Sequence, residues 1–195
     1  MKIVATIEAR LNSTRLPKKH FYKIGNKYVI QVLIDRLKKI KNISKIIIST
    51  TNNKIDKKLV ELAKKNRIGF FCGSEDNVLQ RVILSAKKYN ADAILQVSGD
   101  SPFIDFSLVD HQIKMFRINK VDIATEYWKN FPAGVTAPII KVSALEKSLK
   151  SYRNTDDLEH VTNYIFENKK KFKILYFLAQ EKNYCPSLEL IIDEY

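Results

Sequence analysis

The first segment that could carry chemistry is the basic stretch at residues 9–19, ARLNSTRLPKK. Its cations include Arg10, Arg15 and Lys19, and hydroxyl groups and Asn12 lie between them. Backbone N–H groups of such a turn, together with arginine and lysine side chains, can bind a polyphosphate. The stretch contains no glycine, so it is neither a P-loop nor a GxGxxG fingerprint. By its residues alone, it could equally be a solvated basic loop.

The second segment is Ser98–Pro102, in which Asp100 follows a predicted buried strand. Gly99 precedes this carboxylate and would leave room for a ligand to approach. A carboxylate there suits a Mg²⁺ ion that is held jointly by the protein and by substrate phosphates. A further acid, Asp193, follows the last predicted strand and could meet Asp100 across the sheet. Taken alone, a Gly-Asp pair is also typical of an ordinary turn.

The elements that must position these segments alternate between apolar runs of strand length and amphipathic helical patterns. We predict strands at Ile3–Thr6, Lys45–Ser49, Ile68–Phe71 and Ala93–Val97, and helices at Val29–Ile40, Asp56–Lys65 and Glu75–Tyr89. Such alternation is typical of βαβ units and of a parallel sheet covered on both faces. Ligands of these sheets bind beyond the carboxyl ends of the strands, which is where both polar segments lie.

The pattern is less regular in the second half of the chain. We predict a helix at Ser107–Ile118 capped by Ser107, a helix at Asp156–Glu167, and strands at Val121–Thr125, Pro138–Val142, Phe172–Leu178 and Leu188–Ile192. The irregular stretch 126–136 contains Trp128, which could line a sugar pocket or simply pack. We therefore expect one α/β domain over residues 1–195, with a mostly parallel sheet that becomes mixed in its C-terminal half.

Composition narrows the class of protein. The chain has 195 residues, of which 45% are hydrophobic and 28% charged, and this excludes disordered and fibrous classes. No apolar run approaches the roughly 20 residues of a membrane span, so we expect no membrane partner. Cys72 and Cys185 are far apart and form no CxxC motif. A disulfide scaffold or structural zinc site is therefore not expected, and a cytoplasmic location is the default.

The net charge of +13 comes mainly from lysine, since the 34 basic residues include only seven arginines. Many lysines occur in pairs on predicted helix faces, and base-reading arginine is scarce. We therefore expect no nucleic-acid partner, whereas a polyanionic small ligand such as a nucleotide suits the same positive field. A nucleic-acid binder remains a minor alternative, which a steep salt dependence of duplex binding would reveal.

Together, the polar segments resemble a known family. The stretch ARLNSTRLPKKHFYKIGNK is similar to the N-terminal signature ARxGSTRLPxKxLxxxxGK of sugar cytidylyltransferases, which activate 3-deoxy-octulosonic and sialic-type acids. The chain most resembles the spore-coat polysaccharide biosynthesis (SpsF-like) branch of the acylneuraminate cytidylyltransferase superfamily. Five further segments resemble that branch in the same order: CGSEDNVLQR (72–81), SGDSPFID (98–105), FPAG (131–134), LEHVT (158–162) and LELIID (188–193).

The resemblance implies a Rossmann-like fold of the nucleotide-diphospho-sugar transferase type and a definite reaction. CMP would pass from CTP to a sugar for surface polysaccharide biosynthesis, with release of pyrophosphate and with Mg²⁺ as cofactor. Arg10 and Lys19 would be the catalytic cations, and Asp100 and Asp193 the metal ligands. The nucleotide would contact Ala9, Arg10, Asn12, Ser13, Arg15, Lys19 and Gly99, and the sugar would contact Gly134, Glu159 and His160. Residues 75–77 could contact the ligand, but we favour helix capping for them.

Several positions depart from the family pattern. Asn12 and Lys18 stand where the family has glycine, and Leu158 stands where the branch has arginine. The segment after Gly134 lacks the acids of the branch. The chain also ends soon after Asp193, whereas relatives continue, so we expect a shortened C-terminus whose exposed apolar surface a homodimer could cover.

Two alternatives to the cytidylyltransferase remain open. A glycosyltransferase could use the same architecture to bind a finished nucleotide-sugar, and it would release no pyrophosphate. A degenerate relative could bind a nucleotide without turnover, which the departures from the family pattern would explain.

Overall fold

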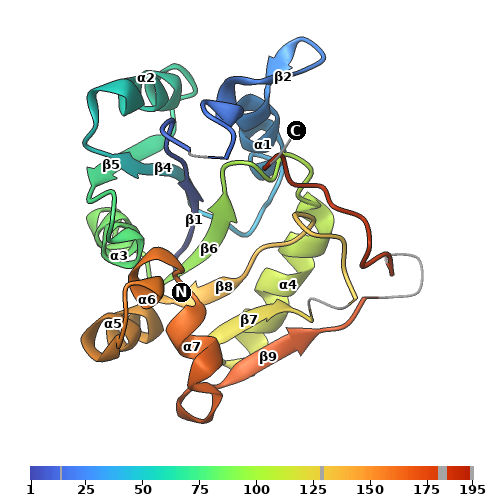
Figure 1. Cartoon of the computed structure of the whole chain (residues 1–195). Helices are drawn as coiled ribbons and strands as arrows, with labels where there is room; N and C mark the ends of the chain where they lie inside the picture. Colours follow the sequence, from blue (N-terminus) through green and yellow to red (C-terminus); the bar gives the residue numbers. More distant parts are fainter. Residues whose placement is uncertain (14, 128–129, 180–183, 194–195) are drawn as a thin grey trace.

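The computed structural model describes residues 1–13, 15–127, 130–179 and 184–193. Within them, seven strands form one sheet in the order β5-β4-β1-β6-β8-β7-β9, and β2 and β3 form a separate hairpin (Figure 1). The strands are β1 (Ile3–Glu8), β2 (Lys23–Ile24), β3 (Lys27–Tyr28), β4 (Lys45–Thr51), β5 (Gly69–Gly73), β6 (Ala93–Ser98), β7 (Ile123–Glu126), β8 (Ile139–Lys141) and β9 (Ile174–Phe177).

Helices connect most of these strands. The α-helices are α1 (Val29–Leu37), α2 (Lys57–Lys65), α3 (Val78–Lys88), α4 (Phe106–Asn119), α5 (Val142–Ser151), α6 (Asp156–Glu159) and α7 (Asn163–Glu167). Three 3₁₀ turns are described: η1 (Lys19–Phe21), η2 (Lys54–Asp56) and η3 (Lys169–Lys171). No helix in the described ranges is both long and apolar enough to cross a membrane.

Strand direction matches the expected fold class. Strands β5, β4, β1 and β6 are parallel, β8 runs antiparallel to both β6 and β7, and β9 is parallel to β7. The sheet is therefore mostly parallel and becomes mixed in the C-terminal half, as the sequence predicts. Parallel strands place their carboxyl ends at one edge, so the residues after β1 and β6 are neighbours.

The sheet is buried on both faces. Side chains that alternate along β1 enter two different cores: Ile3, Ala5 and Ile7 lie in one and Val4 in the other. Residues of α1, α2 and α4 complete the first core, and residues of α3, α5 and α7 complete the second. This two-sided burial explains why the strands read as continuous apolar runs.

Two predicted helices differ in the structure, and one helix was not predicted. Helix α4 is capped by Asp105 rather than by Ser107, because Asp105 Oδ1 accepts from the backbone N–H groups of Ser107 and Leu108, each at 2.9 Å. The predicted helix Asp156–Glu167 is interrupted, because His160 has an extended backbone (φ −100°, ψ 96°) between α6 and α7. The sequence analysis also left α5 unassigned.

The predicted strand Leu188–Ile192 is not a strand. Only an isolated bridge joins Glu189 to Ala133 in the described chain. The backbone groups of this segment bond to loops instead: Leu190 N–H donates to the carbonyl of Ala133, and Ile192 N–H donates to the carbonyl of Asp100, both at 2.9 Å. The segment therefore follows the carboxyl edge of the sheet rather than extending it.

Candidate active site

The basic loop 9–19 leaves the carboxyl end of β1 and is anchored on one side. Leu11 and Leu16 are buried, and Leu11 N–H donates to Asp56 Oδ1 at 2.8 Å. Asp56 is itself fully buried and accepts from the Thr51 hydroxyl. Lys18 N–H closes the base of the loop by donating to the carbonyl of Leu11 at 3.1 Å. These contacts fix the described backbone of the loop at the end of the sheet.

Lys19 lies between two carboxylates. Its Nζ contacts Asp100 Oδ2 and lies 2.6 Å from Asp193 Oδ1, and both Lys19 and Asp100 are 7% exposed. Arg15 contacts the other oxygen of Asp193 at 2.7 Å. Both carboxylates thus share the Lys19 cation at the carboxyl ends of β1 and β6. A buried cluster of this kind is held by charge-assisted hydrogen bonds, which are stronger than neutral ones.

Asp193 reaches Asp100 through the backbone of the segment that carries it. Ile192 N–H donates to the carbonyl of Asp100, which brings the next residue in the chain, Asp193, beside Lys19. The hydrogen bond from Lys19 lowers the pKa of Asp193, and the positive charges of Lys19 and Arg15 lower it further. Asp193 is therefore ionised at neutral pH. The predicted meeting of the two acids does occur in the structure, by this route rather than across two strands of the sheet.

A cavity of about 540 Å³ opens beside this cluster, and we call it the Lys19 cavity. Its lining residues come from β1, loop 9–19, α3, the β6 end and the α6–α7 break. They are Glu8, Ala9, Arg10, Ser13, Arg15, Lys19, His20, Val78, Arg81, Ser98, Asp100, Glu159 and His160. The volume lies in the range typical of small-molecule sites. Most of the predicted nucleotide and sugar residues thus line one cavity.

Arg10 joins the Lys19 cavity to a neighbouring cavity of about 430 Å³, to which Glu75 contributes. Its guanidinium lies 3.5 Å from Glu159 and 3.9 Å from Glu75. Glu75 therefore pairs with Arg10 rather than capping α3. The capping residue is Asn77, whose side-chain oxygen accepts from Gln80 N–H at 2.8 Å. Exposed pairs at these distances are weak, so Arg10 can exchange them for a ligand anion.

Two charged residues of the Lys19 cavity were missed as candidate site residues. Glu8 Oε2 accepts from Gln96 at 3.1 Å, while Oε1 is shielded from solvent and has no partner among the described residues. Burial raises the pKa of Glu8 to about 7. Arg81 is buried, donates to the carbonyls of Ser74 and Glu75, and makes no ion pair with a described residue. The sequence could have indicated both residues, because each places a charged side chain on an otherwise apolar strand or helix face.

His20 and Gly99 pack against each other beneath the cluster. A Cβ atom at Gly99 would lie 2.9 Å from His20 Cε1 and 3.0 Å from the carbonyl oxygen of Glu8. Gly99 is therefore required by close packing, rather than only by the approach of a ligand as the sequence suggested. Burial lowers the pKa of His20, which keeps its imidazole neutral. His20 also lines the Lys19 cavity, a position that its place in the sequence did not predict.

Some predicted site residues lie elsewhere. Asn12 is exposed and is not among the residues that line the Lys19 cavity. The left-handed backbone in this loop belongs to Lys18 (φ 58°), not to Asn12. Gly134 (φ 85°) packs against the backbone of Leu190, which a Cβ atom would approach to 3.0 Å, and so it supports the segment that carries Asp193. Trp128 lies outside the described residues.

The donor set of the cluster suits a hard divalent cation. Asp100 Oδ1 is buried and has no hydrogen-bond partner among the described residues, and Asp193 supplies an ionised carboxylate beside it. Carboxylate oxygens are the ligands that Mg²⁺ prefers, and two of them are sufficient when substrate phosphates supply others. No group of three potential ligands gathers among the described side chains. The described carboxylates would therefore hold Mg²⁺ together with an oxygen-rich substrate.

Comparison with known proteins agrees with this geometry. A family model described as cytidylyltransferase matches residues 4–191. An uncharacterised protein of Methanocaldococcus jannaschii is 36% identical over 99% of this chain and 79% of its own length. The spore coat polysaccharide biosynthesis protein SpsF of Bacillus subtilis is 28% identical over 98% of this chain and 81% of its own length.

A solved structure is similar over the whole fold. The structure of a cytidylyltransferase from Leptospira borgpetersenii superposes with a TM-score of 0.93 at 33% identity, and the match covers 99% of this chain and 82% of that one. The predicted family and the predicted class of enzyme are therefore confirmed. The chain belongs to the cytidylyltransferase family, whose members are nucleotidyltransferases.

Proposed function

We propose that this protein transfers CMP from CTP to a sugar hydroxyl, with release of pyrophosphate, in a reaction that depends on Mg²⁺. One observation carries the proposal: Lys19 lies between Asp100 and Asp193 at the edge of a cavity large enough for a nucleotide. The substrate would be a sialic-like or 3-deoxy-octulosonic acid that supplies surface polysaccharide. The relationship to a protein named for spore coat polysaccharide biosynthesis supports a sugar acceptor.

The residues of the Lys19 cavity suit this reaction. The sugar hydroxyl attacks the α-phosphorus of CTP, and negative charge grows on the oxygen that bridges the α- and β-phosphates. Lys19 is a fixed cation that can stabilise this charge without reorganising, and Arg10 can exchange its weak carboxylate pairs for the phosphates. Asp100 and Asp193 would hold Mg²⁺, which when bound neutralises phosphate oxygens and favours departure of pyrophosphate. Glu159 and His160, which also line the cavity, are the proposed sugar contacts.

The first experiment is a binding titration of CTP, ATP, GTP and UTP with and without Mg²⁺, followed by a screen of keto-sugar acids for pyrophosphate release. We expect a Mg²⁺-dependent preference for CTP and release of pyrophosphate with one class of acid. A glycosyltransferase would consume a nucleotide-sugar without releasing pyrophosphate. Flat, weak binding of all four nucleotides would contradict the proposal and favour a degenerate relative.

Substitution of Lys19 tests the assignment of the site. Lys19→Ala should lower turnover by about 10²–10³-fold, because a fixed cation is removed from the developing charge. Lys23→Ala is the matched control, since Lys23 is an exposed lysine of β2 outside the Lys19 cavity, and its turnover should stay at the wild-type level. Circular dichroism would check that both variants fold. Equal turnover in the two variants would remove Lys19 from the site.

The cytoplasmic location and the homodimer remain predictions.

A further inference from the structure

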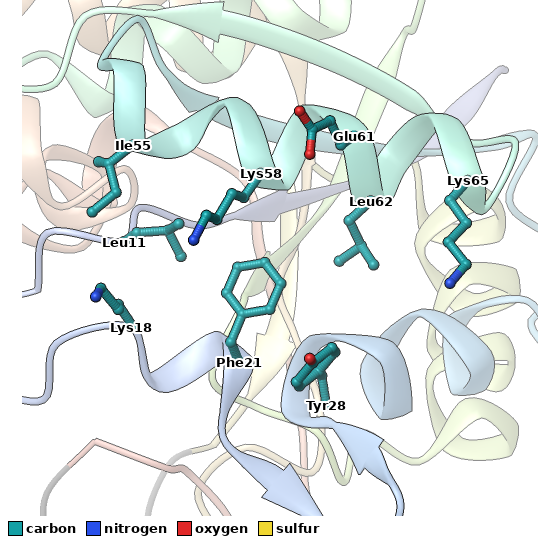
Figure 2. A pocket seen from close by; sticks show the side chains of 9 residues that line it. All are labelled: Leu11, Lys18, Phe21, Tyr28, Ile55, Lys58, Glu61, Leu62 and Lys65. Atoms are coloured by element: carbon teal, nitrogen blue, oxygen red, sulfur yellow. The ribbon is translucent and has the colours of Figure 1, made fainter.

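A second cavity lies on the other face of the basic loop, between that loop and helix α2 (Figure 2). We call it the Phe21 cavity; its volume is about 460 Å³. Leu11 and Lys18 line it, whereas their chain neighbours Arg10 and Lys19 line the Lys19 cavity. The two cavities thus share one loop but no lining residue.

The centre of the Phe21 cavity is apolar and partly aromatic. In Figure 2, Leu62 of α2 points down toward the ring of Phe21, and Tyr28 lies beside that ring. The rings of Phe21 and Tyr28 meet edge to face with their centroids 5.2 Å apart. Tyr28 keeps 41% and Ile55 keeps 38% of their surface exposed. Exposed apolar side chains that converge on a hollow are typical of a binding surface.

The rim of the Phe21 cavity carries unbalanced positive charge. Lys18, Lys58 and Lys65 line it, and Glu61 is its one acidic residue. None of the three ammonium groups makes a hydrogen bond or an ion pair within the described part of the chain. Other lysines of the protein are neutralised: Lys27 contacts Asp35 at 2.6 Å, for example. In Figure 2 the Lys58 and Lys65 side chains extend down from α2 on either side of Leu62, so positive charge lies beside the apolar surface.

We propose that the Phe21 cavity is a second ligand site, which takes a small amphipathic anion. The ligand would have an aromatic or hydrocarbon body that packs on Phe21, Tyr28 and Leu62. It would also have a phosphate, sulfonate or carboxylate group that pairs with Lys58 or with Lys65. Neither part alone explains the site, because an uncharged apolar ligand would leave the ammonium groups unpaired and a simple anion would not cover the rings.

The site would act on the loop that it shares with the Lys19 cavity. Leu11 N–H is bound to Asp56 at the start of α2, and Lys18 N–H is bound to the carbonyl of Leu11. A ligand that packs against the side chains of Leu11 and Lys18 would therefore stabilise both ends of the segment between them. Amide exchange at these two N–H groups should slow when the ligand binds, whether or not a nucleotide is present.

The test uses 8-anilinonaphthalene-1-sulfonate as the anionic probe and N-phenyl-1-naphthylamine, which lacks the sulfonate, as the uncharged probe. We expect saturable binding of the sulfonate and at least a tenfold weaker affinity in the double variant Lys58→Ala/Lys65→Ala. The uncharged probe should lose little affinity in that variant. Lys57→Ala is the matched control, because Lys57 lies on the same helix but does not line the cavity, and it should bind both probes as the wild type does.

Hydrogen exchange measured by mass spectrometry locates the bound probe. The peptide that contains residues 11–18 should take up deuterium more slowly with the sulfonate, in the wild type and in Arg10→Ala, but not in the double variant. Unchanged affinity in a folded double variant would overturn the proposal. Loss of binding in Arg10→Ala alone would also overturn it, since the probe would then occupy the Lys19 cavity. Probe binding that falls as sedimentation shows a dimer forming would assign the surface to a second copy and overturn it too.

Discussion

At the scale of single residues, Glu8 has an unusual environment for an acid. Its carboxyl group ends β1 at the Lys19 cavity, and burial raises its pKa to about 7 from an ordinary value of 4.5. The folded protein therefore keeps a proton on Glu8 between these two pH values, while the unfolded chain loses it. The contribution of Glu8 to the free energy of unfolding must then fall as the pH rises from about 4.5 to about 7, and it stays low above that range.

Glu8→Gln should remove this dependence, because glutamine has the same shape and does not titrate. At about pH 8 we expect the variant to exceed the wild type in unfolding free energy by about 3 kcal/mol, and at about pH 4 we expect the two to be nearly equal. Urea unfolding of the variant and the wild type at several pH values would measure both differences in free energy. Glu61→Gln is the control, since Glu61 is exposed on α2. Parallel pH curves for Glu8→Gln and the wild type would show that Glu8 is ionised in the folded protein.

At the scale of elements, the start of α4 depends on one side chain. Asp105 Oδ1 accepts from two N–H groups of the first turn, those of Ser107 and Leu108. Asp105→Ala should lower the free energy of unfolding by about 1 kcal/mol, within the usual range of about 0.5–2 kcal/mol for a lost cap. Ser107→Ala should change it by less than about 0.5 kcal/mol. Urea unfolding of both variants shows which residue caps α4. A larger loss of unfolding free energy in Ser107→Ala would restore Ser107 as the cap.

The elements themselves were predicted with uneven success, and the reason is physical. Strands β1, β4, β5 and β6 lie in the parallel part of the sheet, where local apolar runs are sufficient to identify them. The break between α6 and α7 depends on Asp157, which is buried and accepts from Arg153 N–H at 2.9 Å and from the Asn163 side chain at 2.8 Å. Helical periodicity carries no information about such contacts.

At the scale of the whole molecule, one sheet separates two cores and joins both halves of the chain. Strands β1, β6 and β8 contribute side chains to each core, so neither core can form without the sheet. We therefore expect a single cooperative unfolding transition for residues 1–195. Far-ultraviolet and near-ultraviolet circular dichroism in urea should give coincident midpoints. Two separate midpoints would contradict the prediction of one domain.

The sequence by itself determined the family, the class of fold and the chemical character of the site. Apolar runs indicated the buried strands, and the basic loop with Asp100 predicted a site for phosphates and a cation, which stays a prediction. These features are local, since each depends on residue types within a dozen positions. The prediction that loop 9–19 and Asp100 lie together also followed, because parallel strands place their carboxyl ends at one edge.

Only the tertiary structure decided which residues far apart in the sequence share the site, and in which direction their pKa values move. Asp193 reaches Lys19 because Ile192 bonds to the backbone of Asp100, through a segment that is not a strand. Glu8 and Arg81 join the Lys19 cavity because of burial, which also sets the direction in which their pKa values move. Solvent exclusion and contacts between residues far apart in sequence arise only when the chain folds, so residue types and spacing could not predict them.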